Sequence, residues 1–170
     1  TDDLAQTTAK PTVATAANRR LTQALVAAAT DDSWQEEHPS PHLSEFVSQL
    51  RTLHRVLSSV GAEFGYRTYY EARRFASVYF ALGGTDWHNA LDLQVMQKVL
   101  PKLHGSRRRL EPTLSALGRF CFDLEAADTQ ASQFDPVAAT AANPQLPISF
   151  EKIRRMTLSL RANQFASFTE

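Results

Sequence analysis

The sequence has little of several residue types, and each shortage excludes a class of protein. Cys121 is the one cysteine, so an internal disulfide cannot form and a reducing, cytoplasmic setting is expected. The six glycines form neither a G-x-G-x-x-G nor a G-x-x-x-x-G-K-[ST] pattern, so this sequence contains no recognisable phosphate-binding loop. Apolar runs are all shorter than the roughly 18–20 residues that span a bilayer, so no membrane contact is expected.

An excess of one charge is also missing. Lysine and arginine together number 18, as do aspartate and glutamate, so the formal net charge is zero. Such a balance gives no overall field to attract nucleic acid or an anionic membrane. Any contact of that kind has to come from a local patch of basic residues.

Metal-ligand and catalytic patterns are absent as well. There is no C-x-x-C and no H-E-x-x-H, and the prolines around His38 and His42 disfavour a helical ligand pair, so we predict no metal site. Cys121 falls on an apolar stripe, which favours a buried, inert thiol, although a Cys/His pair brought together by folding stays open. No acid–base pair or nucleophile stands at an informative spacing, so this chain alone is expected not to be catalytic.

Apolar side chains recurring at three- and four-residue steps are what the sequence does contain. With 170 residues, 43% of them apolar, the chain is long enough for one domain with a real core. No long run alternates with period two, so no strand is expected. We predict an all-α fold, a single bundle of about six helices. The expected helices cover residues 17–30, 42–60, 66–82, 88–100, 106–126 and 149–161.

Local residues predict where these helices begin and end. Pro41 suits a first turn, and Gly61 and Gly83 suit C-terminal stops. Asp86 and Ser149 are placed to cap the helices that follow them.

Composition divides the chain into residues 1–40, an N-terminal arm with a short Ala-rich helix, and residues 41–170, a helical domain. Residues 127–147 are rich in Ala, Thr, Gln and Pro and are expected to form a loop. Phe165 and Phe168 are expected to pin the tail to the core. The absence of an initiator methionine suggests a cut boundary or a processed end rather than a natural start.

Arg67 is the first candidate binding residue. It opens an expected helix after Gly65, next to free backbone N–H groups and the positive end of the helix dipole, which favours a phosphate. The alternative is an ion pair with Glu63 or with Glu71 on the same helix face.

Three consecutive arginines, Arg107, Arg108 and Arg109, form a second candidate site. Basic residues oppose the dipole at a helix start, and this cost makes a contact with nucleotide or DNA phosphates more plausible. The alternative is a solvated surface turn. Base-specific reading has no support, since neither a zinc finger nor a helix-turn-helix is recognisable.

Aromatic residues gather between residues 66 and 80, interleaved with arginines. This pattern resembles a stacking surface for single-stranded nucleic acid. Aromatics at helical spacing more often form core, with Tyr66 and Tyr70 the best candidates for exposure.

Ordered motifs carry a resemblance over residues 41–168. They read F-G-Y-R at residues 64–67, K-V-L-P-K-L-H-G at residues 98–105, and P-I-S-F-E-K-I-R-R-M at residues 147–156 with the ending F-A-S-F at residues 165–168. Together they resemble the C-terminal helical region of McrB-like AAA+ NTPases, the motor subunits of modification-dependent restriction systems.

The resemblance implies a lid domain of an AAA+ motor in DNA restriction or antiphage defence. Arg67 would be the sensor-2 arginine that reaches the nucleotide phosphates. It implies no cofactor for this chain alone, and ATP or GTP with Mg²⁺ in the parent protein. The implied partners are the AAA+ core of the parent chain, neighbouring motor subunits and a McrC-like nuclease, with DNA contact indirect. The alternative is a stand-alone helical interaction module that binds a protein or nucleic acid through residues 66–74.

Overall fold

The computed structural model describes residues 23, 26–27, 40–124, 134–139 and 143–169. The chain divides into two compact units, residues 1–37 and 38–170, and the second contains the hydrophobic core. Of the helix expected over residues 17–30, the described Gln23, Val26 and Ala27 are helical. The rest of that helix, the arm before it and most of the following loop lie outside the described residues, as does much of the loop expected over 127–147.

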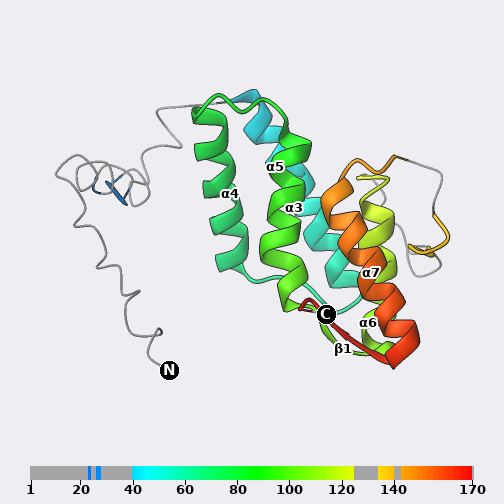
Figure 1. Cartoon of the computed structure of the whole chain (residues 1–170). Coiled ribbons are helices and arrows are strands. Elements are labelled where there is room, and N and C mark those ends of the chain that lie inside the picture. The colour runs from blue at the N-terminus through cyan, green and yellow to red at the C-terminus, as the bar shows by residue number, and fades with distance from the viewer. Residues whose placement is uncertain (1–22, 24–25, 28–39, 125–133, 140–142, 170) are drawn as a thin grey trace, which may run out of the picture. The chain divides into compact units, whose positions relative to one another are not determined.

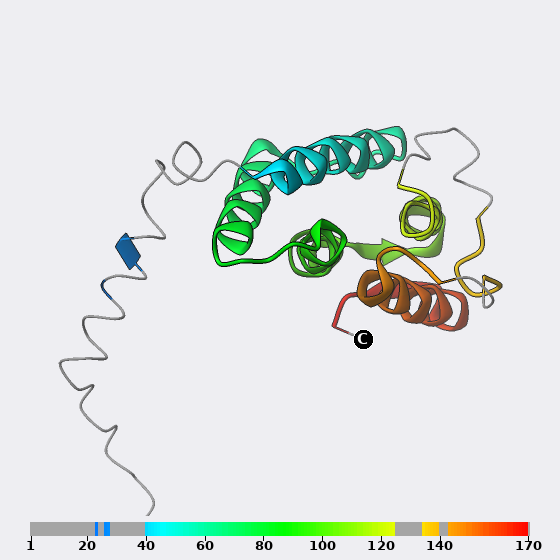
Figure 2. The same ribbon diagram turned by 90° about the horizontal axis from the view of Figure 1, so that it is seen from above.

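The second unit is a bundle of helices, which confirms the all-α prediction (Figure 1). Helices α3 (Pro41–Ser59) and α7 (Pro147–Asn163) lie on opposite sides of α5 (Trp87–Gln94) and α6 (Arg107–Phe120) (Figure 2). Helix α4 (Tyr66–Ala81) packs against α3 and α5. The expectation of no strand was wrong, because two three-residue strands, at residues 104–106 and 165–167, pair with each other. Strands this short leave no periodic signal. The elements are α3 (Pro41–Ser59), α4 (Tyr66–Ala81), α5 (Trp87–Gln94), the π-helix η1 (Val95–Val99), the 3₁₀-helix η2 (Leu100–Lys102), β1 (His104–Ser106), α6 (Arg107–Phe120), α7 (Pro147–Asn163) and β2 (Phe165–Ser167).

The predicted apolar stripes form the core. In α3, Leu53 is fully buried and its neighbour His54 is half-buried. On α4 the buried aromatic is Phe80, while Tyr79 is only partly buried. Cys121 is fully buried, and this burial raises the pKa of its thiol, as expected for an inert core cysteine. The stripe running into and beyond α6 is buried throughout, at Leu110, Leu114, Leu117, Cys121 and Leu124.

The helix ends follow the residues that predicted them. Gly61 and Gly83 adopt φ values of 68° and 92°, a left-handed region that favours glycine. In each case the next residue closes a Schellman motif; for α3, Ala62 N donates to Leu57 O at 2.9 Å. The Asp86 carboxylate caps α5 by accepting from the backbone N–H groups of His88 and Asn89.

The single helix expected over residues 88–100 is a composite. α5 ends at Gln94, and the chain continues as a π-turn in η1 and a 3₁₀-turn in η2. Pro101 lies in η2 and has no N–H for a regular helical bond to Gln97, so the helix cannot continue unchanged through it. The π-turn accommodates the interruption one turn earlier.

The N-terminus of α7 is capped from another helix. The prediction that Ser149 is the cap was wrong, because the helix begins two residues earlier at Pro147. Asp92 of α5, itself 1% exposed, accepts from Ile148 N at 2.8 Å and from Ser149 N at 2.7 Å. The Ser149 hydroxyl donates back to the Asp92 carbonyl at 3.0 Å. Three hydrogen bonds therefore join the middle of α5 to the start of α7.

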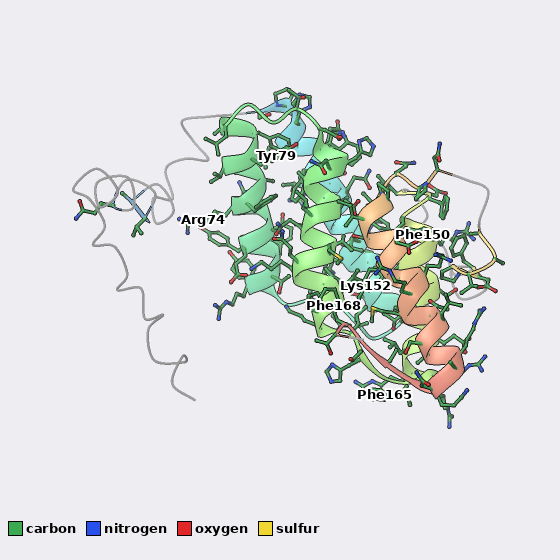
Figure 3. All side chains as sticks on the ribbon, viewed as in Figure 1. Arg74, Tyr79, Phe150, Lys152, Phe165 and Phe168 are labelled. Carbon is green, nitrogen blue, oxygen red and sulfur yellow. The ribbon has the colours of Figure 1, made fainter. Side chains whose placement is uncertain are left out.

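The end of the chain is held by backbone pairing more than by aromatic anchors. β1 and β2 are antiparallel, with Gly105 opposite Ala166, and Ala166 is buried. Phe165 is 45% exposed, so its expected role as an anchor was wrong. Phe168 does pack against the core, and Lys152 Nζ lies 4.8 Å from the centre of its ring (Figure 3).

Candidate functional site

Two of the segments that carry the sequence resemblance, residues 64–67 and 98–105, meet the tail strand β2 at one end of the bundle. The motif at residues 147–156 begins α7 elsewhere and contacts Asp92 of α5. The Lys102 ammonium donates to the Thr68 hydroxyl, which joins η2 to the first turn of α4. Lys98 Nζ lies 2.8 Å from Glu71 Oε2 and joins η1 to the second turn of α4. The β1–β2 pairing brings residues 165–167 beside residues 104–106 (Figure 1). We call this region, residues 64–71, 98–109 and 165–167, the motif end.

Arg67 stands in the first turn of α4, where Gly65 is the N-cap. Its Nε lies 2.8 Å from Glu71 Oε1, so the ion pair within the helix is present and the alternative pair with Glu63 is not. This pairing raises the pKa of the Arg67 guanidinium. The arginine side chain is nevertheless 92% exposed, so a ligand on another domain can reach it without displacing packed residues.

Glu71 links two basic groups with its two carboxylate oxygens. Oε2 accepts from Lys98 and Oε1 from Arg67. The hydrogen bond from Lys98, followed by the one from Arg67, lowers the pKa of Glu71 to about 2. The carboxylate therefore stays ionised in mild acid and keeps α4 tied to η1.

The Glu71 carboxylate makes the stability of the domain depend on pH. The pKa of Glu71 is lower in the folded chain than in the unfolded chain. Its contribution to the free energy of unfolding is therefore complete above about pH 4.5 and is lost as the pH falls to about 2. Denaturation of the wild type and of Glu71→Gln at several pH values should show a difference that shrinks across this window. A difference that stays constant with pH would contradict the lowered pKa.

The three consecutive arginines have separate environments. Arg107 forms a two-point ion pair with Glu111, Nε to Oε2 at 3.0 Å and Nη2 to Oε1 at 3.2 Å. Its backbone N–H also donates to Gln164 O at 2.9 Å, so Arg107 has a structural role in joining α6 to the tail. Arg108 and Arg109 are exposed. They are the members of the predicted cluster that are available for phosphate contact.

Arg109 is on the rim of a hollow of about 250 Å³. The hollow lies between the α3–α4 loop, η2 with β1, and the first turns of α6. Lys102 and His104 also line it, with Glu63 as the acidic member and Phe64 and Leu110 among its apolar residues. The fold thus brings Arg109 together with Lys102, while Arg67 does not line this hollow.

A larger groove, with a volume of about 630 Å³, runs between α3 and α4. We call it the α3–α4 groove. Sequence reasoning missed its α3 wall, although Arg51, His54 and Arg55 recur at helical spacing on the polar face of that helix and could have been noticed there. The lining residues are Ser48, Arg51, His54, Arg55, Phe64, Gly65, Tyr66 and Tyr69.

The aromatic residues of α4 divide between core and surface. Phe80 is buried, and Tyr69, Phe75 and Tyr79 pack against the core. Tyr66 is 78% exposed, and its ring stacks on that of Tyr70 at 6.1 Å between centroids. The core interpretation therefore holds for most of the cluster, and the predicted exposure of Tyr66 is confirmed.

Residues 22–165 match a protein family described as a domain of unknown function, DUF8727. The chain belongs to this family. Comparison with curated proteins and with solved structures gives no match. The DUF8727 match ends at the first residue of β2, so it includes nearly the whole motif end and the α3–α4 groove.

Within the described residues, no group of three histidine, cysteine, aspartate or glutamate side chains is placed to hold a metal ion. No helix in this part of the chain is long and apolar enough to cross a membrane.

Proposed function

We propose that this DUF8727 chain is the C-terminal lid of a McrB-like AAA+ NTPase in DNA restriction or antiphage defence. The supporting observation is the motif end, where sequence segments far apart in the chain become neighbours. Lys98 and Lys102 of the second motif contact the helix that the first motif opens, and the tail pairs with β1. Fold alone does not imply function, so the proposal depends on these residues and their contacts.

In this proposal Arg67 contacts the nucleotide phosphates. Glu71 accepts from Nε and limits the directions that the guanidinium can take, while the side chain stays 92% exposed. ATP or GTP with Mg²⁺ would be held by the core of the parent motor, and the lid would supply a charge that stabilises the phosphates. Because Glu71 also binds Lys98, movement of Arg67 would be transmitted to η1 and the rest of the bundle.

The other surfaces of the bundle would then contact the parent core, neighbouring motor subunits and a McrC-like nuclease. Arg108 and Arg109 are exposed and are the residues proposed for phosphate or DNA contact; Arg107 is already paired with Glu111. DNA contact in this proposal is indirect, through the assembled motor.

The proposal predicts a motor core in the same protein. Sequencing the reading frame upstream of the codon for Thr1 should reveal a G-x-x-x-x-G-K-[ST] segment. An initiator codon directly before Thr1 would contradict it.

The isolated 170-residue chain provides a second check. It should neither hydrolyse ATP or GTP nor bind them tightly, because the phosphate-binding loop would be on the core. Calorimetric titration with each nucleotide and Mg²⁺ measures this. Tight binding by the isolated chain would show that it is not a lid.

A further inference from the structure

We propose that the α3–α4 groove binds single-stranded nucleic acid. The charged or titratable basic residues that line it are Arg51, His54 and Arg55, and no carboxylate among the described residues contributes to its walls. Its remaining lining is largely aromatic and apolar, with Phe64, Tyr66 and Tyr69 on the α4 side. Basic groups that follow a backbone beside rings that accept bases are the two components of a single-strand site. The groove does not include Arg67, so the proposal stands independently of the lid.

The positive charge of the groove is not neutralised within the described part of the chain. Arg51 is exposed, and its side chain forms no hydrogen bond or ion pair with any described residue. Arg55 donates from Nη2 to the Thr52 hydroxyl at 3.0 Å, which is a neutral partner. These two arginines are one turn apart on α3, a rise of about 6 Å. That separation is comparable to the spacing of successive phosphates in an extended strand.

The opposite wall offers a platform for a base. Tyr66 is 78% exposed, an unusual position for a large ring that would gain from burial. The rings of Tyr66 and Tyr70 are 28° from parallel, so the Tyr66 ring is supported on one side. His54 of α3 packs edge-on against Phe64, with 5.2 Å between the ring centroids, so the two rings link the walls of the groove. A base stacking on Tyr66 would extend the existing pair of rings over the groove.

This combination favours a single strand over other anionic partners. The bases of a duplex are stacked within the helix and cannot lie on Tyr66. An acidic protein segment would pair with Arg51 and Arg55 but would not stack on the Tyr66 ring. Ribose and deoxyribose strands share the features that the groove recognises, so both chemistries are tested.

The test uses the 170-residue chain and fluorescent oligo(dT) and oligo(rU) of about 12 nucleotides, a length within the usual site size of one domain. Fluorescence anisotropy should detect binding of at least one strand, weaker binding of the matching duplex, and little competition by a poly-glutamate peptide. Tyr66→Leu should weaken binding about 5- to 150-fold, the range for loss of one stacked base, while Tyr66→Phe should retain it. Leu82→Ala is the matched control, since Leu82 is also 78% exposed and lies at the C-terminal end of α4.

Replacing the two arginines of the groove should change the salt dependence of binding. Arg51→Ala with Arg55→Ala should reduce the slope of log affinity against log salt by about 1.4, corresponding to two lost phosphate contacts. Arg154→Ala with Arg155→Ala removes the same charge from α7, on the far side of α5 and α6, and should leave the slope unchanged. Circular dichroism of each variant verifies the fold.

Three results would overturn the proposal. The first is that the folded chain binds neither strand. The second is that Tyr66→Leu and the wild type have equal affinities for the strand. The third is that poly-glutamate competes for the groove as well as unlabelled oligo(dT) does. The last would identify an acidic protein segment as the occupant. Tighter binding of oligo(rU) or of oligo(dT) supports the site in either case and identifies RNA or DNA as its partner.

Discussion

Replacing Asp92 with alanine should lower the free energy of unfolding by about 3 kcal/mol or more, from the loss of two hydrogen bonds to a charged group at roughly 1.5–3 kcal/mol each. Asp92 is buried and accepts from Ile148 N and Ser149 N. Without it, the Ser149 N–H stays fully buried with no acceptor in place, because Ser149 is 0% exposed. The N-terminus of α7 also loses the negative charge that complements its dipole.

Urea denaturation of three variants separates these contributions. Asp92→Asn keeps the shape and one acceptor oxygen, so it should be clearly less damaging than alanine. Ser149→Ala removes the single hydroxyl donor to the Asp92 carbonyl and should cost about 1 kcal/mol. Glu45→Ala, an exposed acid on α3, is the control and should remain within about 0.5 kcal/mol of the wild type. A loss below about 1 kcal/mol for Asp92→Ala would show that water or a shifted α7 replaces the cap.

This cap illustrates what one sequence cannot reveal. The pattern Leu91–Asp92–Leu93 places one polar residue in an apolar helix, which periodicity alone assigns to the surface. Ser149 is a residue type that often caps its own helix, yet its hydrogen-bond partner, Asp92, is 57 positions away in the chain. A tertiary contact of that length has no local signature, so the cap was assigned to the wrong residue.

Local features were predictable for the opposite reason. Gly61 and Gly83 end helices because their φ values are unfavourable for other residues, and Asp86 caps the helix that it directly precedes. The apolar stripes of α3, α6 and α7 depend on a period that each helix carries in its own residues. The π-turn in η1 has no comparable local signature, and the sequence did not indicate it.

The two candidate sites differ in the same way. Arg67 was identifiable because a helix start, a glycine and the family resemblance coincide at one place in the sequence. The α3–α4 groove joins residues 48–55 to residues 64–69, and neither stretch alone indicates a binding surface. Arg107 looked equivalent to its two neighbours until the structure placed Glu111 beside it.

If the chain is the lid proposed above, Arg67→Ala in the full-length protein should reduce nucleotide hydrolysis by about 100-fold, the scale for removing one preorganised group that stabilises developing charge. The domain itself should fold normally, because Arg67 is 92% exposed and contacts only the surface carboxylate of Glu71 among the described residues. Nucleotide affinity should fall less than the rate, since the charge on the phosphates increases in the transition state.

Arg155→Ala is the matched control for this variant. Arg155 is also an exposed arginine, 64% accessible, and it pairs with a glutamate in its own helix, Glu151, at 3.3 Å. Its removal should leave the hydrolysis rate within about twofold, as expected for a solvated surface pair. Glu71→Gln gives an intermediate test: it frees the guanidinium without removing it, so the rate should fall by less than for Arg67→Ala. If Arg67→Ala and Arg155→Ala had equal rates, Arg67 would be a surface residue and the lid proposal would lose its sensor.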